Sequence, residues 1–107
     1  MQHLTAPELA ALLASNSGAA PVLLDVREPW EYQLCRIAGT VSMPMNTIPG
    51  QLDQIDREAQ IVCICHHGAR SLRVAQFLEN NGFEQVVNLT GGVHAWATQV
   101  DPSMPTY

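Results

Sequence analysis

The sequence predicts an α/β fold in which a parallel sheet lies between layers of helices. Short apolar runs that suit buried strands alternate with stretches in which apolar residues recur at helical spacing. The run Ile61–Ile64 is apolar throughout, which is typical of a central strand covered on both faces. The length of 107 residues suits one domain, so residues 1–107 are expected to form a single unit.

Four short stretches are expected to form strands. Val22–Leu24 and Ile61–Ile64 are apolar runs, and Gln85–Leu89 resembles them in composition. A further short strand is expected around Val41, within Gly39–Pro44. Because helical stretches separate these strands, the sheet should be parallel, and its ligand site should lie beyond the carboxyl ends of the strands.

Capping residues and apolar spacing predict the helices. Thr5 and Glu8 form the pattern of a capping box, and a short helix that begins at Pro29 should run to about Tyr32. The other expected helices are one or two turns within Asn46–Ile55, a helix holding Val74, Phe77 and Leu78, and a last helix holding Val93, Ala95 and Trp96. The small residues of Ser15–Ala20 indicate a loop.

Composition and charge exclude several classes of protein. Apolar residues make up 47% of the chain and charged residues 14%, as in globular rather than disordered proteins. Ten acidic residues against five basic ones give a formal charge of -5, which argues against binding to nucleic acid or to an anionic membrane surface. No apolar run approaches the roughly 18 residues of a membrane span, and no secretory signal is expected.

Three cysteines cannot all pair within one chain, and small disulfide scaffolds carry even sets. A reducing, cytoplasmic setting is therefore the simpler expectation. In that setting a thiol is retained for burial or for chemistry.

The chemistry concentrates where the most buried strand meets the next helix. The segment there consists of Cys65, His66, His67, Gly68, Ala69, Arg70 and Ser71. Free N–H groups at the start of a helix carry partial positive charge, which favours the thiolate of Cys65 over the thiol. Gly68 lets the backbone curl into a nest of N–H groups, and Arg70 adds a planar fork of donors. A lone cysteine is usually only a small buried residue, but this combination favours a nucleophile in an anion cradle.

Four motifs in order resemble the rhodanese family of sulfurtransferases. The active-site loop of that family is similar, with an arginine five positions after the cysteine, as Arg70 follows Cys65 here. The other stretches that resemble family motifs are Leu24–Glu28, Ile37–Thr40 and Asn88–Trp96. Residues 1–107 therefore resemble a single rhodanese domain over nearly their whole length.

This resemblance implies a rhodanese-like three-layer sandwich, with a five-stranded parallel sheet between helices. It implies that a sulfane sulfur moves from a donor such as thiosulfate to a thiophilic acceptor, either cyanide or a thiol, through a persulfide on Cys65. The acceptor thiol could belong to a small molecule or to a protein. The backbone N–H groups from His66 to Arg70 would hold the persulfide, and neither a metal nor an organic cofactor would be needed.

Several other polar residues could have either a functional or a structural role on the evidence of the sequence. His66 and His67 are expected to point apart and so to bind no metal. They either steer and protonate substrates at the entrance or are inert, while His94 is expected to be structural. Asp25, Arg27 and Glu28 are expected to form ion pairs and caps.

The two remaining cysteines are predicted to differ in exposure. Cys63 lies within a predicted strand and should be a core residue. Cys35 lies near a helix end and could be exposed, and it could resolve an oxidised Cys65 if their Cα atoms lie within about 6 Å.

Three classes of function compete at the sequence level. A sulfurtransferase is favoured. A phosphatase or arsenate reductase would need one more residue between the cysteine and the arginine, to surround a tetrahedral oxyanion. A non-enzymatic binding module would usually lack the cysteine. A monomer is the expected state of such a small acidic domain.

Overall fold

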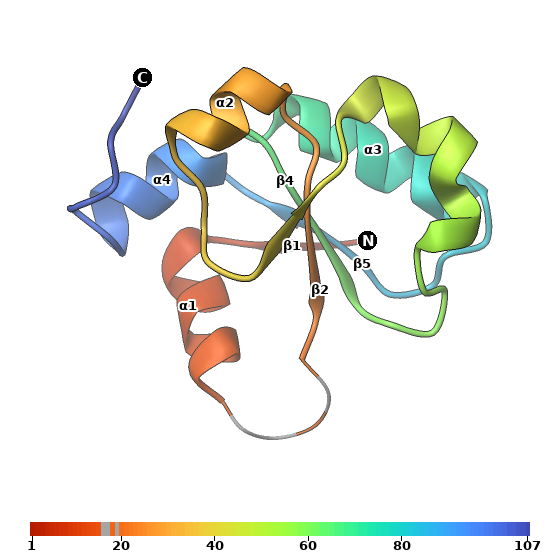
Figure 1. Cartoon of the computed structure of the whole chain (residues 1–107). Coiled ribbons are helices and arrows are strands. Elements are labelled where there is room, and N and C mark those ends of the chain that lie inside the picture. The colour runs from red at the N-terminus through yellow and green to blue at the C-terminus, as the bar shows by residue number, and fades with distance from the viewer. Residues whose placement is uncertain (16–17, 19) are drawn as a thin grey trace.

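The computed structural model describes residues 1–15, 18 and 20–107, so part of the predicted loop Ser15–Ala20 lies outside the described residues. Five parallel strands form one sheet in the order β1-β5-β4-β2-β3 (Figure 1). The strands are β1 (Gln2–Leu4), β2 (Val22–Asp25), β3 (Thr40–Ser42), β4 (Ile61–Ile64) and β5 (Val86–Leu89). The predicted α/β class and five-stranded parallel sheet are confirmed.

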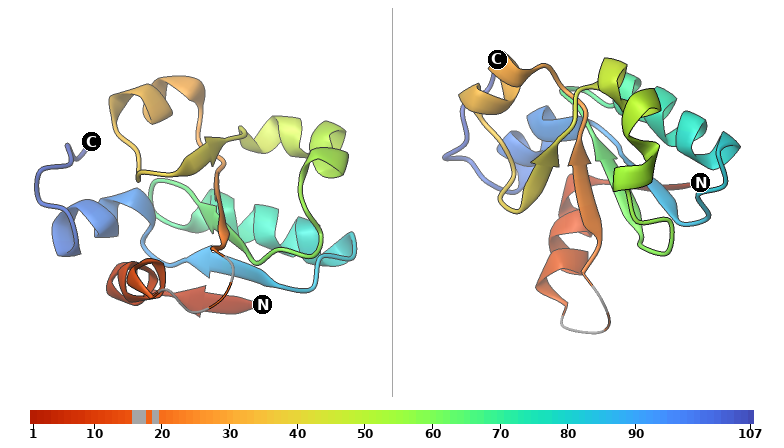
Figure 2. Two further views of the ribbon diagram at one scale, coloured as in Figure 1. Left: turned by 60° about the horizontal axis from the view of Figure 1, so that its bottom comes forward. Right: turned by 45° about the vertical axis from the view of Figure 1, so that its right-hand side comes forward.

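Helices cover both faces of this sheet (Figure 2). They are α1 (Ala6–Ala14), α2 (Pro29–Leu34), the 3-10 segment η1 (Met45–Gln54), α3 (Ala69–Asn80) and α4 (Gly92–Gln99). Buried residues of α1 and α4 pack on one face of the sheet, and those of α3 and η1 pack on the other. Across the part of the chain described, no helix is both long and apolar enough to cross a membrane.

Strand β4 occupies the centre of the sheet. It pairs with β2 on one side and β5 on the other, and all four of its side chains are fully buried. Alternate residues face opposite ways, so Val62 and Ile64 join the core under α1 and α4, while Ile61 and Cys63 join the core under α3. The continuous apolar run predicted this environment correctly.

The structure adds one strand to the four expected from apolar runs. Strand β1 has three residues, Gln2, His3 and Leu4, of which only Leu4 is partly buried. So short and polar a stretch shows no recognisable periodicity, and it becomes a strand because it pairs with β5 at the sheet edge. Helix α2 runs to Leu34, two residues beyond the expected end.

Candidate active site at the carboxyl end of β4

Cys65 is the first residue after β4 and lies at the carboxyl edge of the sheet. Its side chain is buried, with 1% of the residue exposed. Gly68 precedes α3 with φ of 105°, a left-handed conformation that residues with a Cβ rarely adopt. This conformation turns the chain from the end of β4 into α3 within four residues, 65–68. The loop is therefore tight, and the sulfur lies inside it.

Two polar groups contact the Cys65 sulfur. The backbone N–H of Gly68 donates to Sγ across 3.0 Å, and the hydroxyl of Ser71 lies 3.3 Å from Sγ. The amide N–H groups of His66, His67, Ala69 and Arg70 have no protein acceptor among the described residues. The loop thus carries free donors close to a sulfur that already accepts one N–H, which is the arrangement that stabilises an anion.

Ser71 connects the sulfur to Asn88 on the neighbouring strand β5. Its hydroxyl lies 2.5 Å from Asn88 Oδ1 and 3.2 Å from the carbonyl of Gly68, and both side chains are buried. A hydroxyl has one proton and two lone pairs, so Ser71 donates to Asn88 or to Gly68 while it accepts from a Cys65 thiol. When Cys65 is a thiolate, the same hydroxyl can turn and donate to sulfur.

Arg70 uses two of its donors in an ion pair. Its Nη1 and Nη2 lie 2.6 and 2.9 Å from the two carboxylate oxygens of Glu31 in α2. The side chain of Arg70 is 32% exposed and that of Glu31 only 5%. A guanidinium has five N–H donors, so three remain for a substrate anion. The pair fixes the fork of Arg70 beside the loop.

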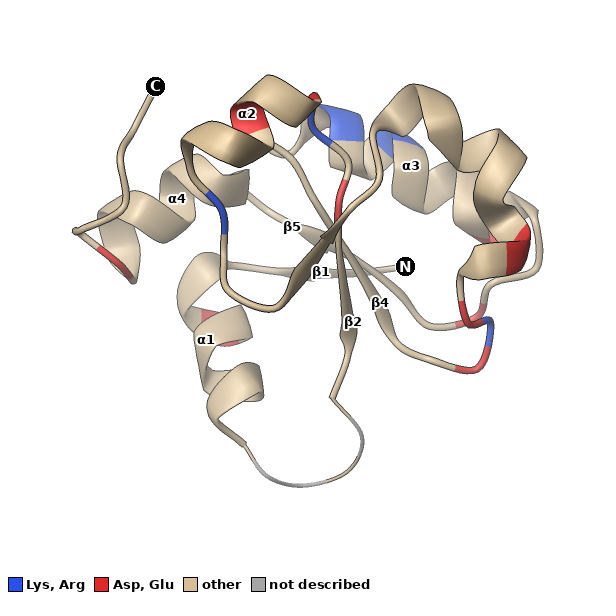
Figure 3. Ribbon diagram, in the orientation of Figure 1, with Lys and Arg blue, Asp and Glu red and all other residues tan. Residues whose placement is uncertain are grey.

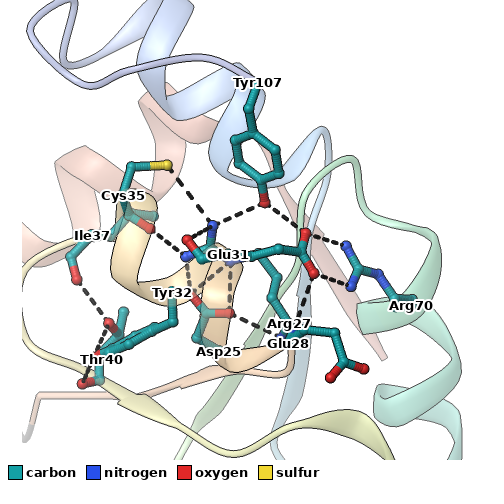
Figure 4. A network of polar contacts seen from close by, with 10 residues as sticks. All are labelled: Asp25, Arg27, Glu28, Glu31, Tyr32, Cys35, Ile37, Thr40, Arg70 and Tyr107. Carbon is teal, nitrogen blue, oxygen red and sulfur yellow. Dashed lines mark hydrogen bonds and ion pairs between the residues drawn. The ribbon is translucent and has the colours of Figure 1, made fainter.

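The pair belongs to a longer network that reaches the C-terminal residue (Figure 4). Tyr107 donates its hydroxyl to Glu31 across 2.7 Å and accepts from Arg27 across 3.0 Å. Arg27 is fully buried and forms an ion pair with Asp25 at 2.7 Å. The expected ion pairing of Asp25 and Arg27 is confirmed, and Glu28 is the residue that precedes α2 as its N-cap.

The environment of this network shifts two pKa values. The hydrogen bonds from Arg70 are the main cause that lowers the pKa of Glu31 to about 2, against the cost of burial. Burial is the main cause that raises the pKa of Tyr107 to about 12. Glu31 is therefore anionic and Tyr107 neutral near pH 7, as the bidentate ion pair and the donated hydroxyl require.

Arginines gather around this edge of the sheet despite the acidic net charge. Figure 3 shows basic segments beside α2 and at the start of α3. Arg27 and Arg70 are paired with carboxylates there, while Arg36 and Arg73 are exposed.

Three histidines lie together at the mouth of the loop. The ring centroids of His66 and His67 are 3.9 Å apart, and that of His94 lies 5.0 Å from His67 and 6.1 Å from His66. The expectation that His66 and His67 point apart is wrong, because the loop curls and places both rings on one side. Burial lowers the pKa of His66, and His67 lowers it further.

Gly92 determines how closely α4 approaches the loop. A Cβ at this position would lie 2.2 Å from the carbonyl oxygen of Cys65 and 2.4 Å from that of His66. The first turn of α4 instead donates to both carbonyls, from Val93 across 2.9 Å and from His94 across 3.1 Å. Two backbone hydrogen bonds therefore hold the loop against α4.

The other two cysteines lie away from this chemistry. All three cysteines are free thiols. Cys63 is fully buried, and burial raises its pKa to about 12, so the prediction of a core residue is confirmed. Cys35 is buried rather than exposed, at 8%, and it belongs to the core on the opposite face of the sheet from Cys65. The sheet between them removes the basis for a resolving role.

The fold and the loop define an α/β protein with a buried cysteine at the carboxyl edge of its sheet. The model of the "Rhodanese-like domain" family matches residues 5–99, so this chain belongs to that family. The expected family is thereby confirmed. The names of its relatives support sulfurtransferase activity.

Three comparisons illustrate the likeness. The "Sulfurtransferase" of Allochromatium vinosum is 36% identical over 76 residues, which cover 71% of each protein. The "Rhodanese-like/PpiC domain-containing protein 12, chloroplastic" of Arabidopsis thaliana is 37% identical over 89 residues, which cover 79% of this chain but only 30% of that protein. The crystal structure of a "Rhodanese-like Domain Protein" from Staphylococcus aureus has a TM-score of 0.84 and 31% identity, and the match covers 100% of this chain and 99% of that one.

The sequence does not predict the contacts of several residues at the site. The sequence places Ser71 only at the end of the loop and Asn88 only within a family motif, and it assigns neither a contact. A polar residue in the otherwise apolar strand Val86–Leu89 was a visible indication of a buried partner. Glu31 and Tyr107 had no such indication, because they are 39 and 76 residues from their partners Arg70 and Glu31.

Proposed function

We propose that the protein transfers sulfane sulfur from thiosulfate, or a donor of the same chemistry, through a persulfide on Cys65. The observation that supports this most is the position of the Cys65 sulfur. It accepts the N–H of Gly68 at 3.0 Å, in a loop whose other amide N–H groups have no protein acceptor among the described residues. Amide donors are suited to the negative charge of both the attacking thiolate and the persulfide.

In the first half-reaction the Cys65 thiolate attacks the outer sulfur of thiosulfate. A new S–S bond forms, the S–S bond of thiosulfate breaks, and sulfite leaves with the bonding electron pair. The negative charge remains on the outer sulfur of the persulfide. The amide N–H groups from His66 to Arg70 stabilise that charge, and the free donors of Arg70 bind the leaving sulfite oxygens.

In the second half-reaction the acceptor removes the outer sulfur. Cyanide or a thiolate attacks that atom, the persulfide S–S bond breaks, and its electron pair returns to Cys65 as thiolate. Cyanide then leaves as thiocyanate, and a thiol acceptor leaves as its own persulfide. The reaction needs no redox partner, because sulfur moves between nucleophiles.

Burial of the reacting sulfur limits the partners. Cys65 is 1% exposed, so its sulfur accepts a slender donor more readily than a bulky one. The acceptor is a small nucleophile or a flexible thiol of a protein segment that reaches the mouth of the loop. One relative, from Bacillus subtilis, is named a "Putative sulfur carrier protein". By analogy we propose a protein thiol as one acceptor of this chain, and a cytoplasmic setting for the free thiol.

Steady-state thiocyanate production from thiosulfate and cyanide tests the proposal. Cys65→Ser should abolish turnover while it leaves the folded circular dichroism spectrum unchanged. Cys35→Ser is the matched control, because it also removes one buried thiol but lies on the other face of the sheet. Turnover that survives in folded Cys65→Ser would disprove the mechanism. So would hydrolysis of an aryl phosphate by a native protein that makes no thiocyanate.

A further inference from the structure

His66, His67 and His94 form a group of nitrogen ligands that sulfur transfer does not use. One ring nitrogen from each side chain lies within 4.8 Å of the other two. His66 and His94 are half-buried and His67 is exposed. His66 Nε2 and His94 Nδ1 are buried atoms without a hydrogen-bond partner in the described structure.

Two buried nitrogens without partners are costly unless something binds them. An unsatisfied buried polar atom destabilises a protein by about 1 to 3 kcal/mol. Neutral imidazole nitrogens are hydrogen-bond acceptors and metal ligands. Both buried nitrogens belong to the histidine group, so a bound cation would satisfy them together.

The backbone holds these ligands in place in advance. His94 donates its N–H to the carbonyl of His66 across 3.1 Å, which ties the first turn of α4 to the loop. The ring of His66 stacks on Tyr107 at 3.8 Å between centroids and an angle of 4°. Tyr107 is itself held by Glu31 and Arg27. His66 and His94 are therefore positioned, while exposed His67 is free to close over an ion.

We propose that His66, His67 and His94 bind one divalent transition-metal ion of the zinc type at the mouth of the Cys65 loop. Zinc bonds to imidazole nitrogen at about 2.0 Å, which holds neighbouring ligands roughly 3.3 Å apart. The nitrogens must therefore approach one another by about 1.5 Å at most.

The ligand set selects the kind of metal. Three imidazoles suit zinc, copper, nickel and cobalt, whereas magnesium and calcium prefer oxygen ligands. Three protein ligands leave the fourth tetrahedral position for water or another small ligand. Since His66 directly follows Cys65, an ion there would place positive charge beside the entrance to the reacting sulfur.

Zinc titration against a chromophoric chelator tests this site without any activity measurement. Wild type should bind one zinc per chain, and magnesium should not compete. His67→Gln and His94→Gln should each weaken zinc binding by at least about tenfold. His3→Gln is the matched control, because His3 is the remaining histidine of the chain, is exposed on β1 and should leave the affinity unchanged.

A fourth variant, Cys65→Ser, separates the histidine site from a site in which the Cys65 thiolate is a ligand. Cys65→Ser should keep the wild-type zinc affinity. Binding lost in Cys65→Ser would make the thiol a ligand and overturn the three-histidine assignment. The assignment also fails if wild type shows no saturable binding, if His67→Gln or His94→Gln binds as wild type does, or if His3→Gln loses as much affinity. His67 is exposed, so His67→Gln keeps the test valid even where His94→Gln fails to fold.

Discussion

At the scale of single residues, two polar groups of the described chain contact the Cys65 sulfur. Gly68 supplies a backbone N–H, and Ser71 supplies a hydroxyl that can accept from the thiol or donate to the thiolate. Asn88 lies behind Ser71 and fixes its orientation. Ser71 therefore acts on the sulfur directly, and Asn88 acts through Ser71.

Replacement of Ser71 by alanine should slow the uptake of sulfur. The thiolate would lose one hydrogen bond, which for a charged group is worth about 1.5 kcal/mol or more, close to tenfold in rate. Stopped-flow measurement of sulfite release from thiosulfate reports this step alone. Ser42→Ala, at an exposed position of β3, should leave the rate unchanged. Equal rates in Ser71→Ala and wild type would remove the hydroxyl from the mechanism.

The sequence predicts Cys65 as the nucleophile, but it does not predict the polar groups that contact the sulfur. A cysteine, a glycine and an arginine at a strand-to-helix junction form a local pattern, so their association was visible within six residues. Asn88 lies 17 residues from Ser71. Its role depends on the pairing of β4 with β5, which no local pattern shows. The role of a site residue was therefore predictable only where the residues that it contacts lie close to it in sequence.

At the scale of elements, the junction between the loop and α4 depends on one glycine. The space beside Gly92 is occupied by two carbonyl oxygens of the loop. Any side chain there would push α4 away and break the hydrogen bonds from Val93 and His94. The two elements pack only because this residue has no Cβ.

Gly92→Ala should destabilise the protein more than Gly39→Ala does. Both glycines have positive φ, 60° and 82°, so both variants bear a left-handed strain of about 1 kcal/mol. Only Gly92 would add a steric clash, because nothing lies within 4 Å of a Cβ at Gly39. Urea denaturation should show a further loss of at least about 2 kcal/mol for Gly92→Ala. If the two variants lost the same free energy of unfolding, α4 would be able to shift away from the loop without destabilising the protein.

Most elements were predictable because their own residues specify them. The capping box of Thr5 and Glu8 is present, and the apolar run Ile61–Ile64 is the central strand. Strand β1 was not, because it forms through its partner β5. The turns expected within Asn46–Ile55 are present as η1, and Pro49 and the non-helical Gln51 give them the 3-10 form in place of a regular helix.

At the scale of the whole molecule, one polar network joins the sheet, α2, α3 and the C-terminal segment. Arg27 follows β2, Glu31 lies in α2, Arg70 lies in the first turn of α3, and Tyr107 is the last residue of the sequence. Glu31 accepts from both Arg70 and Tyr107. Removal of its charge should therefore affect the stability of the whole domain rather than one helix.

The effect of Glu31→Gln should depend on pH in a defined direction. The pKa of Glu31 falls from its ordinary 4.5 to about 2 in the folded protein. The charge therefore stabilises the fold above pH 4.5, by as much as about 3 kcal/mol, and this contribution is lost as pH falls toward 2. The difference in free energy of unfolding between wild type and Glu31→Gln should be largest near pH 6 and should shrink from pH 4.5 downward.

Urea denaturation of both proteins from pH 6 to pH 2 measures that difference. Glu84→Gln, at an exposed carboxylate with no ion pair within the described chain, is the control and should show little dependence. A difference that stays constant over this range would mean that Glu31 does not stabilise the fold through its charge.

The contacts of this polar network were not predictable from sequence, because Arg27 and Tyr107 lie 80 residues apart.

The central claim is that Cys65 carries the transferred sulfur, and intact mass spectrometry tests it most directly. Incubation with thiosulfate should add the mass of one sulfur atom, fragmentation should place it on Cys65, and cyanide should remove it. Cys35→Ser should behave in the same way, while Cys65→Ser should gain nothing. A protein that gains no sulfur, or a gain that persists in Cys65→Ser, would contradict the account.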